Sequence, residues 1–209
     1  MATAFRNSFI LTISSVTVIV LLSSMIGFVL QRRTDRLGSG FAALMLAGLI
    51  VPPAIVPTIF VLETIGLFKS ILGLILIEVA FLMPFAVLIF RTFMSAIPRE
   101  IDEAAIMDGA SGFALFFRVI LPLLRPAMIT VIVVSSVTIY NDFVDPLYFL
   151  PGTGNATVQV TLFAYQSRFF TQYNLLFADV LLIMIPPLIM FIFFQRQIVS
   201  GMTMGSVRG

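Results

Sequence analysis

Five long apolar stretches, separated by short polar segments, dominate the sequence. A transmembrane helix needs about 20 mostly apolar residues to cross roughly 30 Å of hydrocarbon, whereas membrane β-strands alternate over about ten residues. Because the stretches are continuous, they predict an all-α polytopic membrane protein with five transmembrane helices in a single domain, residues 1–209. The stretches run approximately over residues 8–30, 41–62, 70–90, 126–143 and 175–194.

The first stretch follows a basic residue, Arg6, as the apolar core of a signal peptide does. It exceeds the 7–15 residues of such a core, and Gln31, Arg32 and Arg33 follow it in place of a small-residue cleavage site. We therefore interpret it as a retained transmembrane helix.

The composition agrees with a membrane location, because only 11% of the residues are charged, against about 25% in a typical soluble domain. The chain has no His and no Cys. This excludes disulfides, thiolate nucleophiles, a Ser-His-Asp triad and the usual zinc and haem ligand sets. We therefore expect no catalytic residue and no metal in this chain.

The basic residues indicate an orientation, since cytoplasmic loops of membrane proteins carry an excess of Lys and Arg. With the N-terminus outside, nine of the twelve basic residues lie on the inner side. Membrane orientation thus accounts for the excess of basic residues, and we expect no nucleic-acid partner. The C-terminus and the loop 91–125 are then cytoplasmic. The three outer residues are Arg6, Lys69 and Arg168, and the inner ones are Arg32, Arg33, Arg36, Arg91, Arg99, Arg118, Arg125, Arg196 and Arg208.

Prolines interrupt three of the stretches, where they remove backbone donors and bend helices. They either mark a transport pathway or are ordinary kinks that improve packing. No internal repeat is visible, although many secondary transporters have one. The prolines are Pro52, Pro53, Pro57, Pro84, Pro186 and Pro187.

The loop 91–125 predicts two short helices joined at a glycine. Pro98 suits the first turn of the first helix, in which Glu100, Asp102 and Glu103 complement the helix dipole. Gly109 is placed to end this helix.

The second helix of the loop is expected over about 111–121, with Ser111 as its cap and Pro122 as its stop. The alanines of the first helix permit close approach of another backbone, and its acids offer partners to Arg or Lys across an interface. A helix pair lying on lipid is the alternative. The acidic start counts against it, because interfacial helices are usually rich in Lys and Arg.

The loop also resembles a family motif. Glu103-Ala104-Ala105, then Gly109 after three residues and Val119-Ile120-Leu121-Pro122 after nine more, resembles the EAA loop of permease subunits of binding-protein-dependent ABC importers. Val119 stands where the family usually has Ile. The resemblance implies a coupling helix that docks on an ABC ATPase, and the interface would include Glu103, Ala104, Ala105, Asp108, Gly109, Leu121 and Pro122.

The same resemblance implies the partners. The chain lacks a phosphate-binding P-loop, since its only Lys, Lys69, follows Phe68. ATP and Mg would therefore be bound by two partner ATPase subunits, and this chain would hold no cofactor. A second permease subunit, an extracytoplasmic solute-binding protein and membrane lipid complete the expected partners, in a bacterial or archaeal plasma membrane.

Two further segments are similar to carbohydrate-type permeases, in particular the second permease subunit of maltose importers. One is Tyr140-Asn141-Asp142-Phe143 with Pro146-Leu147, where Tyr140 replaces the more usual Trp. The other is the tail 200–209, of which Thr203, Gly205 and Arg208 would contact the ATPase unless the tail is a frayed end. This similarity implies transport of a sugar or related polyol, with a non-sugar solute as the alternative.

The family ordinarily has six spans, and alignment of the motifs leaves this chain without the first. A truncated chain, an internal start and a natural five-span variant all account for that difference.

Four polar residues in or near the spans are candidates for the solute pathway. Glu78 lies about eight residues, or roughly 12 Å, into the third stretch, and must therefore face protein or water. Tyr140, Asn141 and Asp142 come at the outer end of the fourth stretch. Each residue also has a structural alternative. Glu78 is then a buried acid that is protonated or paired, and Tyr140 is an interfacial tyrosine. Asn141 and Asp142 then only end the helix. A secondary transporter in which Glu78 carries a proton or cation is the rival function.

Overall fold

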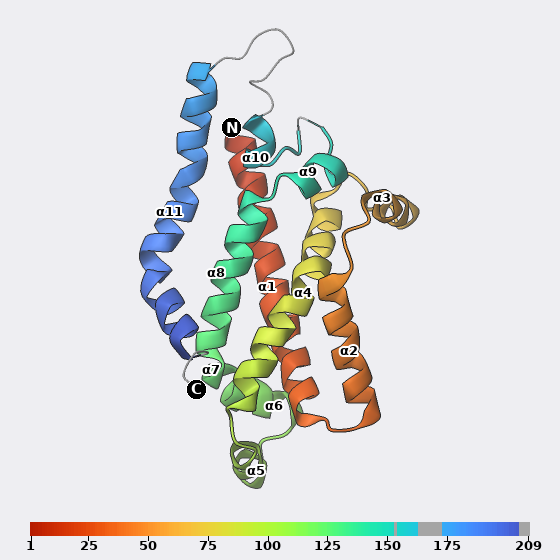
Figure 1. The fold of residues 1–209 in the computed structure, drawn as a ribbon, viewed down its shortest axis with the longest axis vertical. Coiled ribbons are helices and arrows are strands. Elements are labelled where there is room, and N and C mark those ends of the chain that lie inside the picture. The colour runs from red at the N-terminus through yellow and green to blue at the C-terminus, as the bar shows by residue number, and fades with distance from the viewer. Residues whose placement is uncertain (153, 163–172, 205–209) are drawn as a thin grey trace. The chain divides into compact units, whose positions relative to one another are not determined.

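The computed structural model describes residues 1–152, 154–162 and 173–204, and the side chains among them as far as residue 194 (Figure 1). All regular elements in these ranges are helical, as predicted. The helices are α1 (Ala2–Arg32), α2 (Arg36–Ile50), α3 (Ile55–Thr64), α4 (Ile71–Ser95), α5 (Glu100–Met107), α6 (Gly112–Leu115), α7 (Leu121–Leu123), α8 (Arg125–Asn141), α9 (Val144–Phe149), α10 (Val158–Thr161) and α11 (Tyr173–Met204), with a π-helical turn at Phe116–Ile120 between α6 and α7.

Three of the described helices are long and apolar enough to cross a membrane, namely Ala2–Arg32, Ile71–Ser95 and Tyr173–Phe194. Two further helix pairs pass the same test only when taken together. The pair α2 and α3 is bent by 118°, and the pair Gly112–Leu123 and α8 by 76°. The described residues thus provide three to five candidate spans.

The stretch 41–62, which was expected to be one span bent by its prolines, contains two helices, α2 and α3. Val51, with ψ at 120°, ends α2, and Pro52 and Pro53 lie in the break before α3. A residue before proline is pushed out of the helical region, so two consecutive prolines end the helix here. By contrast, Pro84 lies inside α4, and Pro186 and Pro187 lie inside α11.

The chain divides into two compact units, which are described separately. Unit 1 comprises Met1–Val16, Pro53–Val79 and Val133–Gln195, and unit 2 comprises Thr17–Pro52, Ala80–Ile132 and Arg196–Gly209.

In unit 1, the start of α1 is fixed to the segment that leads into α10. The Asn7 Nδ2 donates to the carbonyl oxygens of Ala156 at 3.3 Å and Gly154 at 3.5 Å. The Ser8 Oγ accepts from the Val158 N–H at 3.0 Å. These bonds satisfy loop backbone groups that would otherwise be costly to bury.

In unit 2, the second half of α1 packs closely against α4. A Cβ added to Gly27 would lie 2.8 Å from the Phe90 Cβ, so only glycine permits this approach. The neighbouring Phe28 meets Phe116 of the π-helical turn at 5.7 Å between ring centroids. The end of α1 and the loop after α4 are therefore parts of one packed region.

Candidate functional site

The first helix of the loop, α5, ends as the sequence predicts. Gly109 has φ at +86°, a left-handed conformation that glycine adopts without penalty. Its N–H donates to the Ile106 carbonyl, and the Ala110 N–H donates to the Ala105 carbonyl, both at 2.9 Å. This pair of bonds is the Schellman motif, which satisfies the last carbonyls of the helix. The direction of the chain after α5 is thus fixed by its own backbone.

The acids in the first turn of α5 have different surroundings. Glu103 is exposed, as are Ala104, Asp108 and Gly109, whereas Asp102 is buried. The apolar side chains Ile106 and Met107 are 56% and 87% exposed, and Phe113 after the turn is 71% exposed. The loop therefore exposes both apolar and acidic groups, and the Phe113 ring stacks on Phe117 at 6.4 Å between ring centroids.

Asp102 is bound by the end of α1. The Arg32 Nε donates to the Asp102 Oδ2 at 2.6 Å, and the Arg32 Nη2 to the Oδ1 at 3.0 Å. The Arg32 Nη1 donates to the Ile97 carbonyl at 3.1 Å, and the two charged side chains are only 16% and 13% exposed. The expectation that all three acids are available to another subunit is wrong for Asp102, because a base 70 residues away in the sequence already neutralises it.

The second half of the loop differs from the prediction. Ser111 stands at the N-cap of α6, but its side chain makes no capping hydrogen bond. Pro122 does not stop the helix, because the helical segment continues through α7 as far as Leu123. Leu121 is half-buried and Pro122 is exposed.

A second group of acids lies in unit 1. Glu78 of α4, Asp142 after α8 and Asp145 of α9 have carboxylate oxygens within 4.8 Å of one another. Asp142 is held in place because its carboxylate accepts from the N–H groups of Val144 at 3.0 Å and Asp145 at 3.3 Å. Two negative charges at this distance repel by at least about 3 kcal/mol at an effective dielectric constant of about 20, before solvent screening.

The surroundings of the two aspartates disfavour their charged forms. Burial, followed by the charge of Asp142, raises the pKa of Asp145 to about 6. Burial also raises the pKa of Asp142, although the backbone hydrogen bonds from Val144 and Asp145 oppose the shift. Glu78 is 3% exposed, and its Oε1 has no hydrogen-bond partner among the described residues.

Tyr140 and Asn141, at the end of α8, have separate surroundings. Tyr140 is 5% exposed and packs with Ala4, Val158 and Ile183, so its side chain lies inside unit 1. The Asn141 side chain is exposed and lines a pocket of about 360 Å³ bounded by α8, α10 and α11. There its Oδ1 accepts from the Gln159 Nε2 at 3.1 Å.

Comparison with known proteins identifies the family. The family described as "binding-protein-dependent transport system inner membrane component" matches residues 19–204. The chain belongs to this family. It is therefore a multi-pass membrane permease component of an ABC transporter, and its family works with a binding protein, an ATPase and a second permease.

Several relatives of this permease extend over nearly its whole length. It is 33% identical to a diacetylchitobiose uptake system permease of Streptomyces coelicolor, over 98% of this chain and 69% of the relative. It is 30% identical to a melibiose/raffinose/stachyose import permease of Bacillus subtilis, over 99% and 76%. A bacterial ABC transporter that imports the acidic polysaccharide alginate has the same fold, with a TM-score of 0.82 at 20% identity, over 93% of this chain and 74% of that one.

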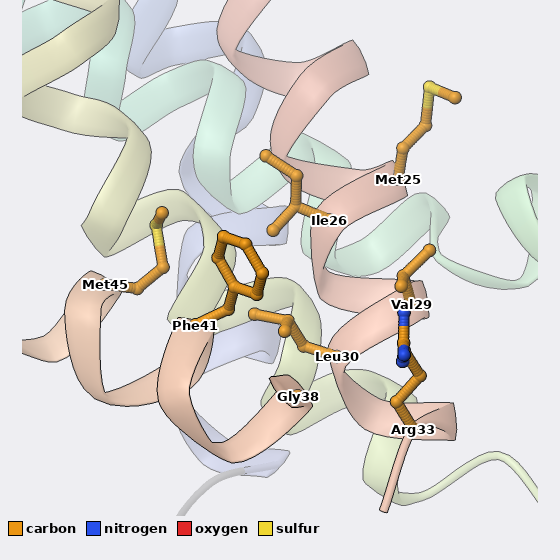
Figure 2. A pocket seen from close by; sticks show the side chains of 8 residues that line it. All are labelled: Met25, Ile26, Val29, Leu30, Arg33, Gly38, Phe41 and Met45. Carbon is orange, nitrogen blue, oxygen red and sulfur yellow. The ribbon is translucent and has the colours of Figure 1, made fainter. Parts of the chain in front are cut away.

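The permease also has an apolar pocket of about 370 Å³ in unit 2, between the end of α1 and the start of α2 (Figure 2). Arg33, which lines it, donates to Asp35 at 2.5 and 3.1 Å, and Asp35 in turn caps α2 by accepting from the Gly38 N–H at 3.0 Å. The hydrogen bond from Arg33, followed by the one from Gly38, lowers the pKa of Asp35. The charges at this pocket therefore neutralise each other. Its lining residues are Met25, Ile26, Val29, Leu30, Arg33, Gly38, Phe41 and Met45.

Of the tail residues, only Thr203 falls within the described backbone, near the end of α11, and its side chain is outside the described residues. Gly205 and Arg208 are outside them altogether.

Two residues were missing from the sequence-based site. Asp145 follows Asp142 by three residues, a spacing that puts two acids near each other in a turn and that would have been a usable signal. Arg32 gave no such signal, because nothing in the sequence relates it to Asp102.

Proposed function

We propose that this chain is one of the two permease subunits of an ABC importer for a sugar or a related polyol, in a bacterial or archaeal plasma membrane. The observation that carries the proposal is the exposed turn after α5, which combines the family motif with a backbone fixed at Gly109. Two relatives are named for the import of carbohydrates, one for diacetylchitobiose and the other for melibiose, raffinose and stachyose. These names favour a carbohydrate as the solute of this chain. A non-sugar solute is the second candidate.

The exposed part of the loop docks on a partner ATPase in this proposal. Glu103 and Asp108 supply charge, and Ala104, Ala105 and Gly109 allow close approach. Leu121 and Pro122 complete the surface on the second half of the loop. The subunit transmits ATP-driven movement only if its loop binds the ATPase more tightly in one state of the bundle than in the other, because equal affinity shifts no equilibrium.

The Arg32–Asp102 ion pair supports this role within unit 2. It connects α5 to the end of α1, and the Arg99 Nη2 adds a hydrogen bond to the Arg32 carbonyl at 3.3 Å. A force applied to α5 therefore reaches the end of a long membrane helix through charged side chains as well as through the backbone.

The solute pathway in this proposal includes Glu78, Tyr140, Asn141 and Asp142. Asn141 supports it most directly, because its amide lies in a pocket with Gln159, where it can exchange hydrogen bonds with hydroxyl groups. Tyr140 has a buried hydroxyl without a hydrogen-bond partner among the described residues, and a hydroxylated solute supplies donors and acceptors. Glu78 is included because it is buried beside Asp142, which directly follows Asn141.

The orientation is also part of the proposal. The nine inner basic residues favour an N-terminus outside, with the loop 91–125 and the C-terminus in the cytoplasm. Thr203, Gly205 and Arg208 then lie on the ATPase side of the membrane.

The test is reconstitution in proteoliposomes with the co-purifying permease and ATPase and the cognate binding protein, whose sugar is first identified by a thermal-shift screen. We expect Glu103→Lys to reduce ATP-driven uptake at least tenfold while the complex stays in the membrane. Glu63→Gln, at an exposed acid of α3, is the control and should transport normally. Uptake by the pure chain alone, without ATP, would overturn the proposal.

Deletion of Thr203–Gly209 tests the tail separately. Coupled ATP hydrolysis should fall if the tail contacts the ATPase, and unchanged hydrolysis would remove the tail from the interface.

A further inference from the structure

The group formed by Glu78, Asp142 and Asp145, here called the acidic triad, comes from two separate parts of unit 1. Glu78 lies in the first half of α4, and the two aspartates lie in the segment after α8. Their carboxylate oxygens are nevertheless within 4.8 Å of one another. Neither the hydrogen bonds nor the ion pairs of the described residues give any of the three a Lys or Arg partner.

Glu78 is the member that points to a missing ligand. Its exposed fraction is only 3%, and its side chain extends to within 4.8 Å of the two aspartate carboxylates. Its Oε1 is fully buried and has no hydrogen-bond partner among the described residues. The Glu78 side chain shares a hydrogen bond with Asp142, which leaves its Oε1 as the oxygen without a partner. Buried polar atoms in folded proteins almost always have partners, so this orphan oxygen requires an explanation.

The distances in the acidic triad match an oxygen-ligated metal ion. Oxygens that bind one calcium ion at about 2.3–2.6 Å lie no more than about 5 Å apart. The spacing of up to 4.8 Å in the triad is within this limit. Calcium accepts only oxygen ligands in flexible arrangements and fills the remaining positions with water or carbonyl groups. Asp142 is already positioned for such a role, because backbone N–H groups hold both of its oxygens.

We propose that the acidic triad binds a divalent cation of the calcium class, with one ligand oxygen from each of Glu78, Asp142 and Asp145. The ion removes the repulsion between the three carboxylates and supplies the partner that the Glu78 Oε1 lacks. It joins the first half of α4 to the residue that directly follows Asn141. The ion therefore fixes the end of α8 beside the pocket that Asn141 lines, whichever solute is transported.

The experiment uses the full chain, purified in detergent with whatever subunits accompany it and stripped of metal with a chelator. Calcium chloride alone is titrated by isothermal calorimetry, without solute or ATP, so that the result does not depend on the transport proposal. We expect one calcium ion per chain and a rise in Tm of several degrees. Glu78→Gln should weaken binding at least tenfold, whereas Glu63→Gln on exposed α3 should leave it unchanged.

Asp145→Asn provides a second variant if the substitution of buried Glu78 prevents folding, because Asp145 is only half-buried. It too should weaken binding at least tenfold. The absence of calcium binding to the wild-type chain would overturn the proposal and leave shared protons as the explanation of the triad. Equal affinity in the wild type and in the folded variants would place the ion elsewhere and would also overturn it.

Discussion

Seven of the ten acids of this chain lie in two regions, and the negative charge is compensated in only one of them. In the loop around α5, the buried acid Asp102 is neutralised by two hydrogen bonds from Arg32, and only exposed acids remain without a base among the described residues. In the segment after α8, Asp142 and Asp145 join the buried Glu78, and the described residues provide no base. The first arrangement stabilises the chain by itself, whereas the second requires a proton or a cation. Burial of an acid therefore does not reveal its role until its partner is known.

The largest effect on stability is expected from breaking the Arg32–Asp102 ion pair. Arg32→Ala leaves Asp102 buried without a base, which should lower the free energy of unfolding by about 3 kcal/mol. It should also reduce coupled ATP hydrolysis, because α5 loses its connection to α1. Chemical denaturation in detergent measures the first effect, and reconstituted ATPase activity the second.

Arg33→Ala is the matched control for that variant. Its pair with Asp35 is about half exposed, so its removal should change stability little. The exchange Arg32→Asp with Asp102→Arg should restore part of the loss, since it reverses the pair. Equal losses of unfolding free energy in Arg32→Ala and Arg33→Ala would show that the buried Arg32–Asp102 pair is no more stabilising than the exposed Arg33–Asp35 pair.

A smaller effect is expected at the turn after α5. Gly109→Ala places a side chain at φ +86° and should destabilise the chain by about 1 kcal/mol. Gly40→Ala, at an open position within α2, should instead stabilise it by up to about 1 kcal/mol, because alanine favours a helix. The denaturant midpoints of the two variants should move in opposite directions. A shift in the same direction would argue against strain at position 109.

The acidic triad can be examined by measuring Tm as a function of pH, with a chelator present to remove metal ions. The pKa of Asp145, raised to about 6, lies above its ordinary value of 3.8, so the folded chain holds a proton that the unfolded chain releases in this window. The contribution of Asp145 to stability is therefore fully present below about pH 4 and is lost as the pH rises through about 6. Asp145→Asn should raise Tm more at about pH 7 than at about pH 4.5. The same Tm shift at both values would contradict the raised pKa.

The smallest effect is expected at Tyr140. Its buried hydroxyl has no hydrogen-bond partner among the described residues, so Tyr140→Phe should leave the stability unchanged or raise it by up to about 1 kcal/mol. The exposed Tyr148→Phe is the control and should be neutral. If solute uptake falls in Tyr140→Phe while Tm does not, the hydroxyl contacts the solute. A clear loss of Tm would mean that the hydroxyl has a stabilising partner after all.

The sequence predicted those parts of the fold that depend on residues close together in the chain. The all-α class followed from continuous apolar stretches, and the end of α5 at Gly109 followed from glycine's freedom to adopt positive φ. The break after Val51 was harder to predict, because prolines inside a membrane stretch can either end a helix or be tolerated, as Pro84 is. Pro122 shows the same ambiguity at a helix start.

The candidate sites were predictable only where their residues are neighbours in the sequence. The exposed residues of the α5 loop belong to one motif, so a single pattern identified them. The partner of Asp102 is 70 residues away, and Glu78 is separated from Asp142 by most of the loop and α8. Pairing across such distances is decided by packing, which a single sequence does not encode in any visible pattern.

The π-helical turn Phe116–Ile120 accommodates one extra residue at the start of the loop's second half. The Leu121 N–H donates to the Phe116 carbonyl, five residues back, so this turn contains one residue more than an α-helical turn. Because a π-turn accommodates one inserted residue, deleting a single residue here would restore the α-helical spacing with little rotation of the residues after the turn. Leu121 and Pro122 would then keep nearly the same direction. At this position the loop can differ in length by one residue without changing which side chains a partner meets.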